Sequence, residues 1–173
     1  IYKVPVKGLR KYSDLCIENS IELDDKTLTF SVPYRNVRSA IAVEGYIETK
    51  DDRFVVKEIE KSSEGTATIT AQLDLESLEG KPFRAFKSEE QTIKATLQLA
   101  FAGTGWTVGE CRILKKRTLS MANVSALDVL KQALKTYRAE IKIDSKKQSI
   151  DIYPEVGSDK GVYFSDQLNL RKL

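Results

Sequence analysis

The chain has 173 residues, of which 41% are hydrophobic and 31% are charged. That length is enough for one medium domain or two small ones, and the composition is that of an ordinary globular protein. No apolar run approaches the roughly 18 residues that a membrane-spanning helix needs, and residues 1–10 lack the apolar stretch of a signal peptide. The sequence therefore predicts a soluble protein without an export signal.

The absence of histidine limits the chemistry that is open to this chain. Histidine is the commonest general base and transition-metal ligand, and none is present. The Ser–His and Cys–His nucleophile pairs are excluded with it. The two cysteines, Cys16 and Cys111, cannot alone form a four-ligand zinc site, so we expect buried free thiols, with a disulfide as the alternative. We predict no catalytic residue, no metal and no cofactor.

Carboxylates are plentiful, but they occur as adjacent pairs, at Asp24–Asp25, Asp51–Asp52 and Glu89–Glu90. Adjacent side chains point to opposite faces of a strand, and on a helix they lie about 100° apart. None of these pairs converges by local geometry. A glycosidase needs two carboxyl groups that face one cleft, and the sequence does not reveal such a pair.

The net charge of +3 is unevenly distributed, because residues 111–147 hold ten Lys/Arg against three Asp/Glu. Such a segment is typical of contact with nucleic acid or with an acidic neighbour. The other interpretation is a solvated helix face. No aromatic residues lie between the basic ones to stack on bases, which favours the solvated face.

The first hundred residues contain repeated strand signals separated by polar turns. In residues 27–32, Leu28, Phe30 and Val32 alternate with polar residues, which is typical of a half-buried strand. Short strands at this spacing indicate a barrel or a sandwich. The expected strands are residues 17–23, 27–32, 41–49, 53–59 and 66–73, the first two forming a hairpin.

A helix is expected from Ser88 onward, with Ser88 and Gln91 forming a capping box and two glutamates between them placed favourably for the helix dipole. Gly103 can end this helix in the left-handed conformation. The apolar stripe consists of Ile93, Leu97 and Phe101.

A second helix is expected from Ser125, which is followed by Asp128 three residues later. Its apolar stripe consists of Leu127, Leu130, Leu134 and Tyr137, with lysines opposite. A hairpin then follows, in which Ile141 and Ile143 face Ile150 and Ile152 across the loop 144–147. A last short strand is expected at residues 161–164.

The segment 103–106 (Gly-Thr-Gly-Trp) superficially resembles a phosphate-binding loop. It follows a helix instead of preceding one and lacks the Lys-Ser/Thr pair of such loops, so a helix stop is the better interpretation. Trp106, the only tryptophan, is then a core anchor beneath the domain junction or an interface residue. Burial is favoured, since large aromatic side chains are mostly buried.

Together these signals predict an α+β, mainly β fold of two small β-barrel-like modules, each with an accompanying helix. The expected domains are residues 1–103 and 104–173, joined near Gly103 to Gly109. The chain begins without Met and its last residues read as the middle of an element, so we expect a fragment of a longer protein, cut within its second module.

Three stretches taken together resemble the N-terminal region of siphophage tail proteins, the group that includes prophage tail endopeptidases and tail-associated lysins of phages that infect Gram-positive bacteria. No single stretch is diagnostic, but their order and spacing are fairly specific. The similar stretches are residues 44–47 with 54–58, residues 73–82 through 102–109, and residues 124–130 with the following hairpin, 161–164 and 168–173.

The resemblance implies domains similar to those of phage baseplate hubs, assembled as a trimeric ring at the tail tip of the virion after synthesis in the bacterial cytoplasm. Its implied partners are the distal tail protein ring and the tape-measure protein, and genome DNA would pass through without specific binding. Lytic or receptor-binding parts would follow residue 173, so no enzymatic activity is expected here. Candidate assembly residues are Gly103, Gly105, Trp106, Tyr163, Asn169 and Arg171.

A lumen that passes DNA should avoid strongly positive walls, because Lys/Arg contacts with phosphate would retain the genome. We therefore expect the basic segment 111–147 to face outward or toward a neighbouring protein. Three other interpretations compete with the tail assignment: a nucleic-acid-binding β-barrel, part of a peptidoglycan hydrolase, and a carbohydrate-binding module.

Overall fold

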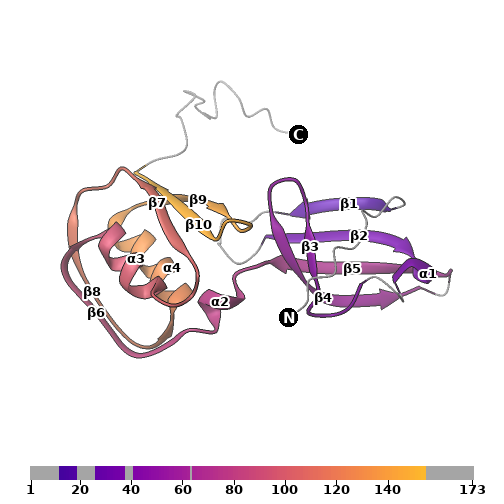
Figure 1. Ribbon diagram of the computed structural model, residues 1–173, viewed down its shortest axis with the longest axis horizontal. Helices are drawn as coiled ribbons and strands as arrows, with labels where there is room; N and C mark the ends of the chain where they lie inside the picture. Colours follow the sequence, from indigo (N-terminus) through magenta and orange to yellow (C-terminus); the bar gives the residue numbers. More distant parts are fainter. Residues whose placement is uncertain (1–11, 19–25, 38–40, 63, 155–173) are drawn as a thin grey trace, which may run out of the picture.

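The computed structural model describes residues 12–18, 26–37, 41–62 and 64–154. These residues form two lobes joined by a short connection at residues 74–81 (Figure 1). Strands predominate in both lobes, and the longer helices lie in the second. The prediction of an α+β, mainly β fold is therefore confirmed.

The first lobe is a five-stranded antiparallel sheet with the strand order β1-β2-β5-β4-β3. Alternation decides its buried face: Leu28, Phe30 and Val32 are buried, and in the β2–β5 register Phe30 lies opposite Ile69. The elements are β1 (Ser13–Glu18), β2 (Thr27–Pro33), α1 (Tyr34–Val37), β3 (Tyr46–Glu48), β4 (Arg53–Lys61) and β5 (Thr66–Leu73).

Most of the strand predictions for this lobe are confirmed, with two corrections. The strand expected from residue 17 begins earlier, at Ser13. The strand expected at residues 41–49 is confined to β3, because the chain turns just before it. The N–H of Gly45 donates to the Ala42 carbonyl at 3.0 Å, and Glu44 has a φ of 62°. Alternation alone does not reveal such a turn. Residues 19–23 of the first expected strand lie outside the described residues.

The connection between the lobes contains the short helix α2 (Glu76–Glu79). Leu75 and Leu78 are almost completely buried, so this segment is anchored by apolar contacts. An ion pair also holds it to the first lobe, because Lys57 Nζ lies 2.7 Å from Glu76 Oε1. The connection is therefore a packed element of the fold.

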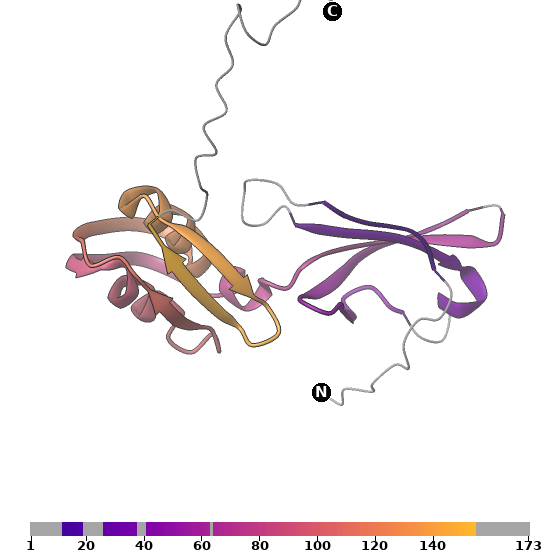
Figure 2. The ribbon, with the colours of Figure 1, turned by 90° about the horizontal axis from the view of Figure 1, so that it is seen from above.

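The second lobe places two helices between a long two-stranded ribbon and a small sheet (Figures 1 and 2). β6 pairs antiparallel with β8, while β10 pairs parallel with β7 and antiparallel with β9. The order strand, helix, strand occurs twice along the chain. The elements are β6 (Pro82–Thr92), α3 (Ile93–Phe101), β7 (Thr107–Cys111), β8 (Lys116–Ser125), α4 (Ala126–Tyr137), β9 (Glu140–Asp144) and β10 (Ser149–Tyr153).

The expected junction near Gly103 to Gly109 lies inside this second lobe. β6 and α3, which precede it, pack against β8 and α4, which follow it. Both long helices therefore belong to one lobe, whereas one had been expected in each module. An apolar stripe shows that a helix has a buried face, but it does not show which core receives that face.

The start of α3 also differs from the prediction. Ser88 and Gln91 lie in β6, and Thr92 caps the helix by accepting a hydrogen bond from the Ala95 N–H at 3.4 Å. Ser88 is buried, and its hydroxyl lies 2.8 Å from that of Thr96. The predicted apolar stripe is confirmed, because Ile93, Leu97 and Phe101 are all buried.

A buried polar network extends from this hydroxyl pair to Tyr137 at the end of α4. The Tyr137 Oη lies 3.2 Å from Thr96 Oγ1, 2.7 Å from the Gln91 carbonyl oxygen and 3.2 Å from that of Arg117. The β6–β8 register shifts between Ser88 and Gln91, where the ladder is interrupted. The phenol therefore supports the two strands at their irregular point.

We expect Tyr137→Phe to destabilise the protein by about 1–3 kcal/mol, because the carbonyls of Gln91 and Arg117 lose a donor in a partly buried position. Chemical denaturation measures this change. Tyr153→Phe is the matched control, since that hydroxyl is hydrogen-bonded to Glu110 at the surface. Equal stability of the two variants would show that the buried network contributes nothing.

The capping box predicted for α4 is confirmed. The Asp128 N–H donates to Ser125 Oγ at 3.1 Å, and the Ser125 N–H donates to Asp128 Oδ2 at 2.8 Å. These bonds from Ser125 favour the ionised carboxylate and lower the pKa of Asp128. The hairpin prediction is confirmed as well, with Ile150 opposite Ile143 and Ile152 opposite Ile141. The strand expected at 161–164 lies outside the described residues.

We expect Asp128→Ala to lower the free energy of unfolding by about 1 kcal/mol at neutral pH, because the cap is lost. The lowered pKa of Asp128 means that this contribution is complete above the ordinary value of 3.8 and is lost as the pH falls through the folded-state pKa. Denaturation at pH 7 and at progressively lower pH measures it. Asp51→Ala, at an exposed turn position, is the control; a difference that persisted unchanged into strong acid would contradict the assignment.

Candidate functional site

The turn after α3 contains three of the candidate assembly residues. Gly103 and Gly105 have φ values of +81° and +87°, a region that favours glycine, and the Thr104 N–H donates to the Phe101 carbonyl at 2.9 Å. This geometry confirms the helix-stop interpretation. Trp106 follows directly.

Trp106 is only 4% exposed, which confirms that it is a core residue. Its indole N–H donates to Ser77 Oγ at 2.9 Å, so the side chain connects the second lobe to α2. A buried tryptophan needs such a partner for its one donor. The residue therefore lies where the second lobe meets α2, and not at the domain junction that had been expected at Gly103 to Gly109.

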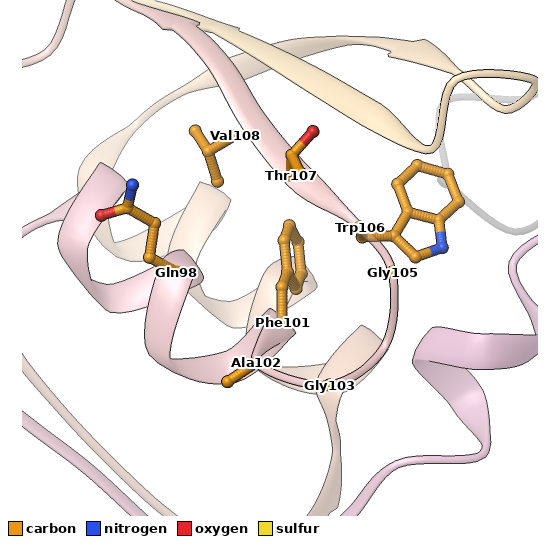
Figure 3. A pocket seen from close by; sticks show the side chains of 8 residues that line it. All are labelled: Gln98, Phe101, Ala102, Gly103, Gly105, Trp106, Thr107 and Val108. Carbon is orange, nitrogen blue, oxygen red and sulfur yellow. The ribbon is translucent and has the colours of Figure 1, made fainter.

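A shallow hollow of about 320 Å³ lies beside this turn (Figure 3). Its lining contains no charged side chain, and the only polar side chains are those of Gln98 and Thr107. The arrangement can receive an apolar side chain but offers no group to hold a phosphate or a metal. The remaining lining residues are Phe101, Ala102, Gly103, Gly105, Trp106 and Val108.

The second feature is a polar junction where the β9–β10 turn meets the start of β4 (Figures 1 and 2). The backbone N–H of Arg53 donates to Ser145 Oγ at 2.7 Å. Lys146 Nζ donates to the Lys50 carbonyl at 2.8 Å and also contacts that of Thr49. The Arg53 guanidinium in turn lies 3.4 Å from the Lys146 carbonyl oxygen.

Arg53 is the centre of this junction. Its guanidinium lies 3.5 Å from Asp74 and 3.4 Å from Glu48, and it sits over the Tyr46 ring. Burial raises the pKa of the Asp74 carboxyl above its ordinary value, and the positive charge of Arg53 opposes that shift. The carboxyl of Asp74 is therefore the ion-pair partner of the partly buried guanidinium of Arg53.

The junction was not predicted. The loop 144–147 reads as an exposed polar turn, yet Ser145 is fully buried. Serine and lysine are ordinary turn residues, so their type gives no signal of a contact more than 90 positions away in the chain. Together with α2, these bonds hold the two lobes in one arrangement.

We expect Ser145→Ala to leave the Arg53 N–H without a partner and to destabilise the protein by roughly 1–3 kcal/mol. Hydrogen exchange of the Arg53 amide should become faster, which tests the contact directly. Ser149→Ala, four positions further along, is the control. An unchanged exchange rate of the Arg53 amide would show that its N–H is not hydrogen-bonded to Ser145.

The cysteines and the basic side chains of residues 111–147 lie mostly at the surface. Both cysteines are free, but the expected burial is wrong for both: Cys16 is exposed on β1 and Cys111 is half-buried. In the basic segment all ten Lys/Arg side chains except those of Lys131 and Lys146 are exposed. Tyr163, Asn169 and Arg171 lie outside the described residues.

Within the described ranges, no group of three or more His, Cys, Asp or Glu side chains is placed to hold a metal ion. None of the helices in that part of the chain has the length and apolar character needed to cross a membrane.

Comparison with known families gives two matches, which lie on either side of α2. Residues 3–73 match the model described as a prophage endopeptidase tail N-terminal domain, and residues 82–152 match the prophage endopeptidase tail domain. The two matched ranges correspond to the two lobes. No curated protein matches the sequence.

Two solved structures share this fold. Prophage tail protein gp18 from Listeria monocytogenes is 19% identical with a TM-score of 0.63, over 75% of this chain and 40% of that one. A tail protein from Neisseria meningitidis is 9% identical with a TM-score of 0.55, over 80% of this chain and 44% of that one. The chain thus spans less than half the length of each.

Proposed function

We propose that this chain, which belongs to the prophage endopeptidase tail family, is a structural part of the tail tip in which copies assemble as a closed trimeric hub. Family membership establishes a tail protein. We propose in addition that the protein lies at the tail tip, that it forms a ring, and that the ring binds the partners named below.

The observation that supports this role best is the packed, hydrogen-bonded connection between two differently built lobes. A ring subunit must present two surfaces at a fixed angle, so that each copy meets the next in the same way. Here α2, Trp106 and the junction at Arg53 hold the lobes together. Such a block suits a repeated heterologous contact.

The proposed partners are the distal tail protein ring above the hub and the tape-measure protein within it. Genome DNA would pass through the lumen without specific binding. The chain itself would be non-catalytic, and any lytic or receptor-binding activity of the whole protein would reside in other segments. This proposal also places the protein in the virion after assembly in the bacterial cytoplasm.

The first experiment locates the protein in particles. Gold-labelled antibodies against this chain, applied to particles from an induced lysogen, should mark the end of the tail opposite the head. Label along the tail tube or on the head would overturn the tip assignment.

The second experiment measures mass in solution by light scattering behind a sizing column. We expect the mass to reach three times that of the 19.5 kDa chain as concentration rises. A longer chain that extends past residue 173 is the companion sample, because further residues can contribute to closure. A monomer in both samples would contradict the ring.

A further inference from the structure

We propose that copies of this chain associate head to tail, with the edge strand β1 of one copy against the β7–β8 connection of the next. The inference rests on the proposed ring and names its contact surfaces. Two exposed surfaces on different lobes support it.

The first surface is β1, at one edge of the first sheet. All six of its residues are exposed, including Leu15 at 51% and Ile17 at 46%. The strand is hydrogen-bonded only to β2, so its outer backbone groups have no strand partner in the described part of the chain. Exposed edges with apolar side chains are usually protected in soluble proteins. The only charged residues of β1 are acidic, Asp14 and Glu18.

The second surface is the connection between β7 and β8. Its centre is Leu114, which is 84% exposed, the highest value among the exposed large apolar side chains of the described residues. Four exposed basic side chains surround it in sequence, at Arg112 and at residues 115–117. Arg112 is paired with Glu110 at 2.8 Å, whereas the ion pairs found across the described ranges include neither Lys115 nor Lys116.

The two surfaces are complementary in apolar character and in charge. Each has exposed aliphatic side chains and charges of opposite sign. On β1, Ile17 and Glu18 project from opposite faces of the strand, so both are reached only by a contact along its edge. Contact would remove the apolar groups from water and place carboxylates near ammonium groups. Contact of either surface with the same surface of another copy would instead bring like charges together, which disfavours pairing of like surfaces.

A single copy cannot make this contact within itself. β1 lies in the first lobe, and the β7–β8 connection lies at the end of the second lobe away from it (Figures 1 and 2). The contact is therefore between copies. In the proposed ring it is heterologous, and heterologous contacts produce rings when the rotation closes. The rigid lobe junction keeps the two surfaces at one separation.

Charge reversal tests the pairing. We expect Glu18→Lys and Lys116→Glu each to weaken self-association about tenfold or more at low salt, by analytical ultracentrifugation, because like charges would then face each other. The two substitutions in one chain should restore association. The matched controls are Glu60→Lys on β4 and Lys142→Glu on β9, both exposed positions outside the proposed surfaces.

A covalent test uses the exposed thiol of Cys16. In a Leu114→Cys variant, a short bis-maleimide should join position 114 of one copy to Cys16 of another, identified by peptide mass spectrometry. A Lys142→Cys variant is the control and should give no such product. Both native cysteines remain in every sample.

Three results would overturn the inference: a chain that stays monomeric at every concentration, reversals that act no more strongly than the controls, or a Lys116→Glu variant that loses only salt-sensitive oligonucleotide binding. The proposed tip location fails separately, if tail particles carry label elsewhere. Association through these surfaces with no label at the tip would refute the location alone.

Discussion

The bond from the Arg53 N–H to the buried hydroxyl of Ser145 is the interaction that makes one body of two lobes. Each lobe has its own strands and apolar side chains, and a single short segment connects them in the chain. A backbone donor enclosed between them must find a partner, because leaving it unpaired costs more than the bond itself contributes. The position of the β9–β10 turn is thereby fixed.

The junction differs chemically from the lobes that it joins. The apolar core continues from one lobe to the other through Leu75 and Leu78, whereas the contact of the β9–β10 turn with β4 consists of hydrogen bonds and partly buried charges around Arg53 and Asp74. Apolar contacts tolerate small displacements, but a hydrogen bond weakens steeply when its donor and acceptor leave a narrow range of distance and angle. A polar junction therefore specifies an angle, which is what a ring subunit requires of its two ends.

The same separation of lobes also separates the charges. The acidic edge strand β1 and the basic connection around Leu114 lie on different lobes, where neither can neutralise the other within a copy. Such a distribution favours contact between unlike surfaces of different copies and disfavours contact between like surfaces. The proposed assembly thus depends on the fold through the distance that it sets between the acidic strand β1 and the basic β7–β8 connection.

Features that arise between neighbours in the chain could be predicted from the residues alone. Alternation in residues 27–32 predicted β2, the Ser125–Asp128 spacing predicted the cap of α4, and the isoleucines predicted the β9–β10 register. The lack of histidine set the limits on chemistry, and the order of similar stretches indicated the family. Periods and caps are visible in sequence because the interacting residues are close together in the chain.

The contacts of Ser88, α3 and Ser145 were decided instead by packing between segments that are distant in the chain. Ser88 reads as a helix cap but pairs with Thr96 in the core, since strand β6 continues to Thr92 once it is paired with β8. The helix α3 reads as part of the first module but packs on α4. Ser145 reads as a solvated turn residue but is buried against β4. In each case the deciding partner is brought close only by the folded chain, and residue type alone does not encode its position.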